Sequence, residues 1–223
     1  MIEGNGKLHH NGLPLHFHPA IKRAAKVISL IFHPLFIPVY LSWFVLNYSN
    51  IFLSISSNDK LILMLRFLVM YTVFPLATVL MSKALGFVSS IYLRTQKDRI
   101  IPYIASGVYY FWMWYVLRNQ PEYPKQFVML ALAIFIASSI GLIFNTYLKV
   151  SMHAISAGVM IAFIYLLSIT AEINYGFYIS ISLLIAGAVC TARLVNSDHN
   201  PGEVYIGLII GIVAQLIGYF FTM

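Results

Sequence analysis

Long apolar runs alternate with short polar connections along almost the whole chain. Seven apolar segments come close to the roughly 20 residues that an α-helix needs to cross the hydrocarbon core of a membrane; they cover residues 27–48, 61–81, 103–117, 127–148, 153–171, 177–192 and 204–221. This pattern predicts an all-α, polytopic transmembrane helix bundle. The bundle would have seven helices, or six if the third segment, which is crowded with Tyr and Trp, lies in the membrane interface instead.

Two prolines interrupt the first apolar segment. Pro34 and Pro38 remove backbone donors, so we expect a kink there that neighbouring helices compensate. His33, directly before Pro34, is expected to be a polar contact inside the bundle. Residues 1–25 are predicted to be a polar N-terminal arm, and residues 26–223 a single transmembrane domain without internal repeats.

Composition supports the membrane class. Hydrophobic residues make up 60% of the chain and charged residues 9%, with a mean hydropathy of +0.82, far from the balance of a soluble domain. The net charge of +7 lies in the connections, where it suits anionic lipids or a phosphate-bearing substrate, and no basic domain for nucleic acid is present. The single cysteine, Cys190, offers neither a disulfide framework nor a metal cluster, so we expect no cofactor and no metal.

Polar residues gather in three of the connections, after the second, fourth and sixth apolar segments. Two crossings separate each of these connections from the next, so all three are predicted to emerge on the same face of the membrane. Their members are Arg94, Lys97, Asp98 and Arg99 in the first, Lys149, Ser151 and His153 in the second, and Arg193, His199 and Glu203 in the third.

The third connection combines a helix start with chemically active residues. Asn200 suits an N-cap, Pro201 the first helical position, and Glu203 then falls on the third. His199 would therefore lie at the start of the helix, within reach of Glu203. The same pattern is that of a capping box, and Arg193 beside a membrane can simply contact lipid headgroups. Taken alone, this connection leaves a structural and a catalytic interpretation open.

Together the three connections hold the residue types that bind and cleave a phosphate ester. Four or five cations can hold a dianionic phosphate, and arginine does so with a planar two-pronged grip. Ser151 and Asn200 would each stand at a helix start, where free amides and the helix dipole favour an anion. One histidine can act as nucleophile and another as general acid, while Glu203 would orient His199 as the third member of a catalytic triad does.

Two of these connections carry recognisable motifs. Arg193, His199 and Glu203 have the spacing arginine, five residues, histidine, three residues, acid, and the run from Ser151 to His153 reads Ser-Met-His. On these residues the chain resembles the type 2 phosphatidic acid phosphatase superfamily, whose third motif ends in Asp rather than Glu and whose second motif is Ser-Gly-His. Membrane members of that superfamily remove phosphate from lipid phosphates.

The first motif of the superfamily is matched only in part. It has a lysine, six residues, then Arg-Pro, whereas this chain has Arg99 followed three residues later by Pro102, with Tyr92 at the place of the lysine. The resemblance covers residues 94–207.

The resemblance implies an integral membrane phosphatase that hydrolyses a lipid phosphate or pyrophosphate, of the phosphatidate or polyprenyl type, without a metal. It implies that His199 attacks phosphorus to give a phosphohistidine, that His153 protonates the leaving alcohol, and that Glu203 supports His199. Phosphate oxygens would be held by Arg193, Arg99 and Ser151, with Lys149 or Lys97 in place of the absent lysine.

The face that carries the site stays open. Ten of the 14 Lys and Arg residues lie on the side of the three connections, which the positive-inside rule would place in the cytoplasm. Five of the ten are site candidates, and without them the count is five against four. The resemblance implies a site outside the cytoplasm, and the expected location is a bacterial inner (plasma) membrane.

Two other functions are compatible with the sequence. A catalytically silent membrane protein of the same fold, acting as a lipid-binding or complex subunit, would explain Met152 and the incomplete first motif. A transporter fits less well, because Arg66 is nearly alone among ionisable residues inside the apolar segments, and transport pathways usually carry several.

Overall fold

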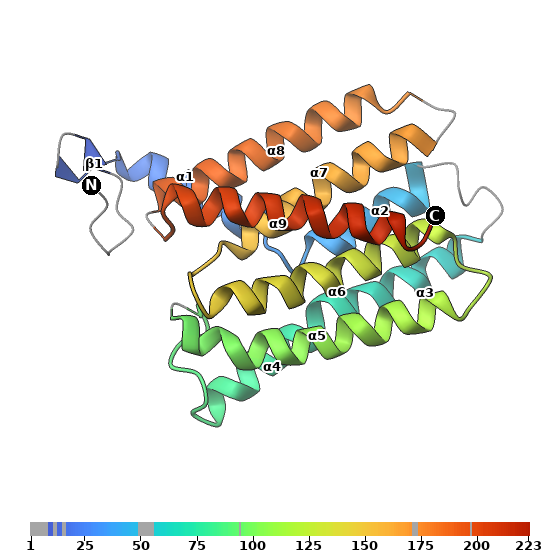
Figure 1. Ribbon diagram of the computed structural model, residues 1–223, viewed down its shortest axis with the longest axis horizontal. Helices are drawn as coiled ribbons and strands as arrows, with labels where there is room; N and C mark the ends of the chain where they lie inside the picture. The colour runs from blue at the N-terminus through green and yellow to red at the C-terminus, as the bar shows by residue number, and fades with distance from the viewer. Residues whose placement is uncertain are drawn as a thin grey trace.

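Helices form almost all of the described structure. The computed structural model describes residues 9–10, 13–14, 17–48, 56–93, 95–170, 174–196 and 198–223. A pair of two-residue antiparallel strands, β1 (His9–His10) and β2 (Leu13–Pro14), precedes the helices. The helices are α1 (Pro19–Ile31), α2 (Ile37–Tyr48), α3 (Ser57–Leu68), α4 (Phe74–Ala84), α5 (Gln96–Arg118), α6 (Lys125–Asn145), α7 (Met152–Thr170), α8 (Gly176–Val195) and α9 (Pro201–Phe220) (Figure 1).

Six helices in the described ranges are long and apolar enough to cross a membrane. Five of them are α5 to α9. The sixth is a continuous helix over residues 57–84, in which one π-helical turn, η1 (Val69–Val73), joins α3 to α4. The all-α transmembrane bundle expected from the apolar pattern is therefore confirmed.

The sequence predicted seven spanning segments, or six if the aromatic third one did not span. Among the six candidate spans, the third predicted segment is present and the first, residues 27–48, is not. Residues 103–117 lie inside α5, an uninterrupted helix of 23 residues that is long and apolar enough to cross a membrane. The expected span at 27–48 is instead divided into α1 and α2, because Pro34 cannot donate a backbone hydrogen bond and excludes His33 from the helical conformation. The expected arm of residues 1–25 also ends early, since α1 already begins at Pro19.

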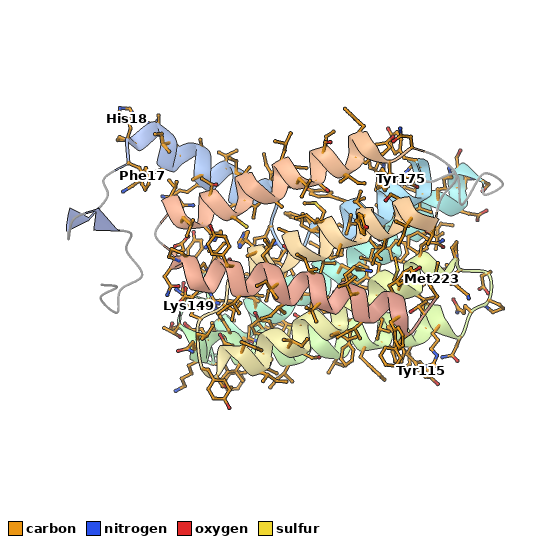
Figure 2. The ribbon with its side chains drawn as sticks, turned by 45° about the horizontal axis from the view of Figure 1, so that its top comes forward. Phe17, His18, Tyr115, Lys149, Tyr175 and Met223 are labelled. Carbon is orange, nitrogen blue, oxygen red and sulfur yellow. The ribbon has the colours of Figure 1, made fainter. Side chains whose placement is uncertain are left out.

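The connections that carry the polar clusters lie at one end of the bundle. Figure 2 shows Phe17, His18 and Lys149 at this end, and Tyr175 and Met223 at the opposite end. Helices α5, α7 and α9 begin at the first end (Figure 1). The described parts of the connections before them, residues 85–93, 95, 146–151, 196 and 198–200, therefore emerge together, as the alternation of the crossings predicts.

The closest helix packing joins α7 to α9. A Cβ atom added at Gly158 of α7 would overlap the Leu208 carbonyl oxygen, and one at Gly211 of α9 would overlap the Ile155 carbonyl oxygen. Small residues of this kind let two backbones approach within a membrane, where dispersion contacts replace the hydrophobic effect between helices. Glycines thus fix α9 against α7, and both helices begin at the end of the bundle that carries the polar connections.

Gly158→Ala is expected to destabilise the bundle, because the new methyl group must push α7 away from α9. Overpacking of this kind costs about 1–3 kcal/mol, so the thermal unfolding temperature of the purified protein in detergent should fall by several degrees. The matched control is Gly187→Ala in α8, where an added Cβ meets nothing within 4 Å. Equal unfolding temperatures for the two variants would contradict the close α7 and α9 contact.

Candidate functional site

A cavity of about 710 Å³ lies among the helices at the end that carries the three connections. Its polar lining includes side chains from all three, while the remainder comes largely from apolar residues of α1, α2, α4, α5, α6 and α7. The ionisable members from the connections and adjoining helix turns are Arg99, Lys149, His153, Arg193, Asp198 and His199. A polar end joined to an apolar chamber is the general form of a site for an amphiphilic ligand.

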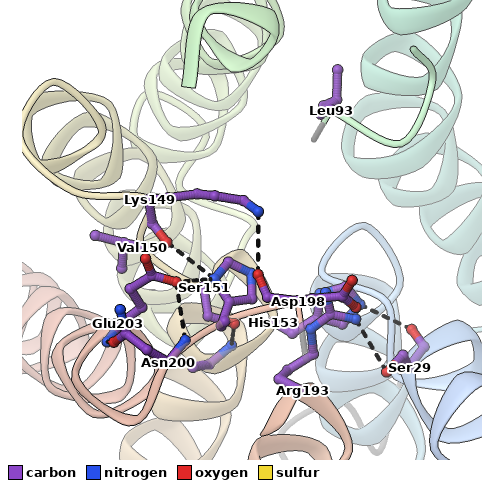
Figure 3. Close-up of polar contacts among 12 residues, drawn as sticks. Ser29, Leu93, Lys149, Val150, Ser151, His153, Arg193, Asp198, Asn200 and Glu203 are labelled. Carbon is purple, nitrogen blue, oxygen red and sulfur yellow. Dashed lines mark hydrogen bonds and ion pairs between the residues drawn. The ribbon is translucent and has the colours of Figure 1, made fainter. Parts of the chain in front are cut away.

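His199 is held by the start of α9. The Asn200 side chain accepts a hydrogen bond from the Glu203 amide at 2.9 Å, and a Glu203 carboxylate oxygen accepts from the Asn200 amide at 3.3 Å, which completes a capping box. The same carboxylate oxygen lies 2.8 Å from Nδ1 of His199. The structural and catalytic interpretations of Glu203 are therefore compatible, because one carboxylate makes both contacts (Figure 3).

The contacts of His199 fix its tautomer. Nδ1 lies 2.8 Å from the Glu203 carboxylate oxygen and 3.0 Å from the Lys149 carbonyl oxygen. Both oxygens can only accept a hydrogen bond, so Nδ1 carries the proton. The ring is 2% exposed and lines the cavity, and Nε2 makes no hydrogen bond within the described ranges. A neutral His199 therefore keeps the lone pair of Nε2 free for a ligand.

Burial lowers the pKa of His199 below its usual value, and the hydrogen bond to Glu203 raises it in part; the positive charges of Arg193 and Arg99 lower it further. At neutral pH the imidazole is consequently unprotonated, which is the form that can attack an electrophile. The carboxylate of Glu203 would stabilise the positive charge that such an attack creates.

Arg193, in the last turn of α8, is paired on two sides. One terminal nitrogen lies 2.8 Å from a carboxylate oxygen of Asp198, and the other donates to the Ser29 hydroxyl at 3.3 Å. Its Nε is buried without a partner. Lys149 donates to the Asp198 carbonyl oxygen at 3.2 Å, and burial is the main reason why the pKa of Lys149 is lowered.

Arg99 is buried in the first turn of α5. Its Nε donates to the Leu93 carbonyl oxygen at 3.0 Å and its Nη1 to the Val150 carbonyl oxygen at 2.8 Å. These bonds connect the first connection to the second and leave Nη2 available. The cavity thus brings together three cations from the connections and adjoining helix turns, Arg99, Lys149 and Arg193, and Lys26 of α1 also lines it.

Three other predicted residues contribute differently or not at all to the lining. Ser151 is fully buried next to the start of α7, where its hydroxyl accepts from the Ala154 amide at 3.4 Å and its amide donates to the Glu203 carbonyl oxygen at 3.2 Å. Glu203 is not among the lining residues and contacts the lining residue His199 through its carboxylate. Lys97 is exposed on α5 and is not among the lining residues, so the structure does not bring it to the site. Arg94 lies outside the described residues.

His153 lines the cavity, but its Nε2 is engaged with the Ser29 carbonyl oxygen at 3.0 Å. The ring of His33 packs edge-on against the ring of His153, with centroids 5.2 Å apart. The sequence did not identify Ser29, His33 or Asp198 as site residues. Only the proline after His33 signalled a break there, and nothing in the order of residues relates Ser29 to positions more than 120 residues away.

Comparisons with protein-family models, with characterised proteins and with solved structures each find no match to this chain. The functional interpretation therefore depends on the geometry of the cavity and on the residues that line it.

Glu203→Gln is expected to lower the pKa of His199 further, because it removes the negative charge that now favours the protonated ring. The titration of His199 can be followed by NMR of protein labelled with ¹⁵N-histidine. Asn200→Ala is the control, since it removes the other half of the capping box and keeps the carboxylate. A pKa that is unchanged in Glu203→Gln would show that this carboxylate serves only as a helix cap.

Proposed function

We propose that the chain is an integral membrane phosphatase that hydrolyses a lipid phosphate or pyrophosphate, of the phosphatidate or polyprenyl type. The observation that carries the proposal is the setting of His199. Its proton is held at Nδ1 by Glu203, its Nε2 makes no hydrogen bond within the described residues, and it lines a cavity with Arg99, Lys149 and Arg193. A nucleophilic nitrogen beside cations is the arrangement that phosphoryl transfer requires.

The charge balance of the polar end supports an anionic ligand. Four cations, Lys26, Arg99, Lys149 and Arg193, line the cavity, and two carboxylates belong to the same end, Asp198 in the lining and Glu203 against His199. Nη2 of Arg99 makes no hydrogen bond within the described residues and still offers a donor. A phosphoryl group at the polar end would accept from it, and the apolar chamber next to it would receive lipid chains.

In the proposed reaction, Nε2 of His199 attacks phosphorus while the bond from phosphorus to the lipid oxygen breaks. His153 gives a proton to that leaving oxygen. Water then attacks the phosphohistidine, His153 takes a proton from the water, and inorganic phosphate leaves. Arg99, Arg193 and Lys149 stabilise the negative charge on the oxygens of the transferred group. The resemblance to the type 2 phosphatidic acid phosphatase superfamily is consistent with these roles, and a site outside the cytoplasm, in a bacterial inner membrane, belongs to the same proposal.

A catalytically silent subunit is the second candidate, and one observation favours it. Arg193 is already paired with Asp198 at 2.8 Å, and Arg99 already donates to two backbone carbonyls. Arginine side chains that already have an ion pair or hydrogen bonds within the protein can serve to hold the connections together instead of binding phosphate. Such a protein would bind lipid in the cavity without cleaving it.

Turnover of lipid phosphates decides between the two candidates. Purified protein in detergent should release phosphate from phosphatidic acid, polyprenyl phosphate or polyprenyl pyrophosphate. His199→Ala should abolish the release, and His153→Ala should reduce it by about 10²–10⁴-fold, the usual contribution of a general acid. His18→Ala, at an exposed position before α1, is the control. No turnover on any of these lipids, with lipid binding retained, would favour the silent subunit.

The pH profile gives an independent check on the nucleophile. His199 must be unprotonated to attack, and its pKa lies below the usual 6.5. The value of kcat/KM, which reports the free enzyme, should therefore fall on the acidic side of the profile with a midpoint below 6.5. A midpoint above 6.5 would mean that another group limits the acidic side of the profile.

A further inference from the structure

The break between α1 and α2 frees backbone groups that would otherwise be bonded within a helix. α1 ends at Ile31, and the amide of Phe32 donates to the Ile28 carbonyl oxygen at 2.9 Å. In a continuing helix the next amide, that of His33, would donate to the Ser29 carbonyl. Pro34 prevents this, because a proline excludes the residue before it from the helical conformation.

His153 takes the place of that missing amide. Its Nε2 lies 3.0 Å from the Ser29 carbonyl oxygen. A carbonyl oxygen only accepts, so Nε2 of His153 carries a proton in every charge state and the neutral ring has its lone pair at Nδ1. This is the opposite tautomer to that of His199, which carries its proton at Nδ1.

His33 is fixed by the same break. Its Nδ1 accepts a hydrogen bond from the Leu35 amide at 3.3 Å. The neutral ring must then carry its proton at Nε2, which makes His33 a donor. Its ring lies edge-on to that of His153 at 5.2 Å, and both rings line the cavity.

We propose that the break at Pro34 is a fourth segment of the site, in which the Ser29 carbonyl sets the tautomer of His153 and His33 donates from Nε2 to a bound phosphoryl oxygen. The inference depends on the proposed function for the identity of the ligand. Pro34 and Ser29 are positioning residues, since they act through His153 and His33.

The tautomer defines how His153 can act as an acid. A lipid phosphate monoanion carries one proton, and this form is still present at neutral pH as the minor species, because the second pKa of a phosphate monoester is about 6. That proton can pass to Nδ1 of His153. When the bond from phosphorus to the lipid oxygen breaks, Nδ1 returns the proton to the leaving oxygen, so no external acid is needed. His33 holds an oxygen of the same group during this exchange.

The tautomer can be measured without any reaction. The full chain, labelled with ¹⁵N-histidine in detergent, should show His153 with its proton on Nε2 and a free Nδ1, and His153→Gln assigns the signals. Pro34→Ala and Pro34→Leu restore an amide at position 34 and free residue 33 to become helical. The His33 amide then competes for the Ser29 carbonyl, so the tautomer of His153 should shift. Pro38→Ala, at the second proline, is the matched control and should leave these signals in place.

A proton on Nδ1 of His153 in the unaltered chain would overturn the proposal, as would unchanged signals in both Pro34 variants. The role of His33 is tested by measuring the affinity for inorganic phosphate in a calorimetric titration. His33→Phe keeps the aromatic packing and removes the donor, so phosphate binding should weaken about tenfold, the effect of one hydrogen bond to a charged group. His33→Gln keeps a donor and should stay within about threefold of the unaltered chain.

The His18→Phe variant provides the exposed control for the titration. Full affinity in His33→Phe would remove His33 from the site. No phosphate binding by the unaltered chain would contradict the proposed function and the role of His33, while the ¹⁵N signals would still decide how the break positions His153. Failure of the inference and failure of the proposed function are therefore distinguishable.

Discussion

The structure depends on one constraint of the membrane, that backbone amides and carbonyls in the hydrocarbon must be bonded within helices. Polar chemistry is then confined to places where a helix starts, ends or breaks. The candidate site follows this rule throughout. Arg99 lies in the first turn of α5, His153 in the first turn of α7, Arg193 in the last turn of α8, and His199 directly before α9. The break after α1 also frees backbone groups within an otherwise apolar segment, and His153 and Tyr40 bond two of the carbonyls there.

Helix ends supply bonding groups as well as side chains. The carbonyls of Leu93, Lys149 and Val150, in the connections, accept from Arg99 and His199. The bonds to Val150 and Lys149 join residues that are 51 and 50 positions apart in the chain. They also orient each side chain before any ligand arrives, which reduces the entropy lost on binding. The polar end of the cavity is therefore organised by main-chain atoms as much as by ionic pairs.

Much of the fold could be predicted from the sequence, because long apolar runs have few alternatives to a membrane helix. The expected spans from 61–81 onward agree with helices at 57–84, 125–145, 152–170, 176–195 and 201–220, apart from a few residues at their ends, and α5 is longer than expected. The structure of the first segment was harder to predict, because the effect of a proline depends on which hydrogen-bond donors the neighbouring residues provide to the freed carbonyls. Here Tyr40 bonds the Ile31 carbonyl and His153 bonds that of Ser29.

The site was less predictable, for reasons of geometry. Lys97 and Arg99 are neighbours in the sequence, but two residues along a helix turn a side chain through about 200°, so that one faces solvent and the other the cavity. Asp198 was visible in the sequence, yet only the structure shows that it pairs with Arg193. The capping box of Asn200 and Glu203 could be recognised in the sequence because it depends on local spacing alone.

The glycine contact between α7 and α9 has a mechanical consequence. His153 is carried by one of these helices, and His199 with Glu203 by the start of the other. Since the two backbones touch at Gly158 and Gly211, neither helix can slide without separating from the other, and the spacing of the two imidazoles is a rigid dimension of the molecule. Any widening that admits a bulky ligand must therefore come from the other lining helices, among them α1, α2 and α4.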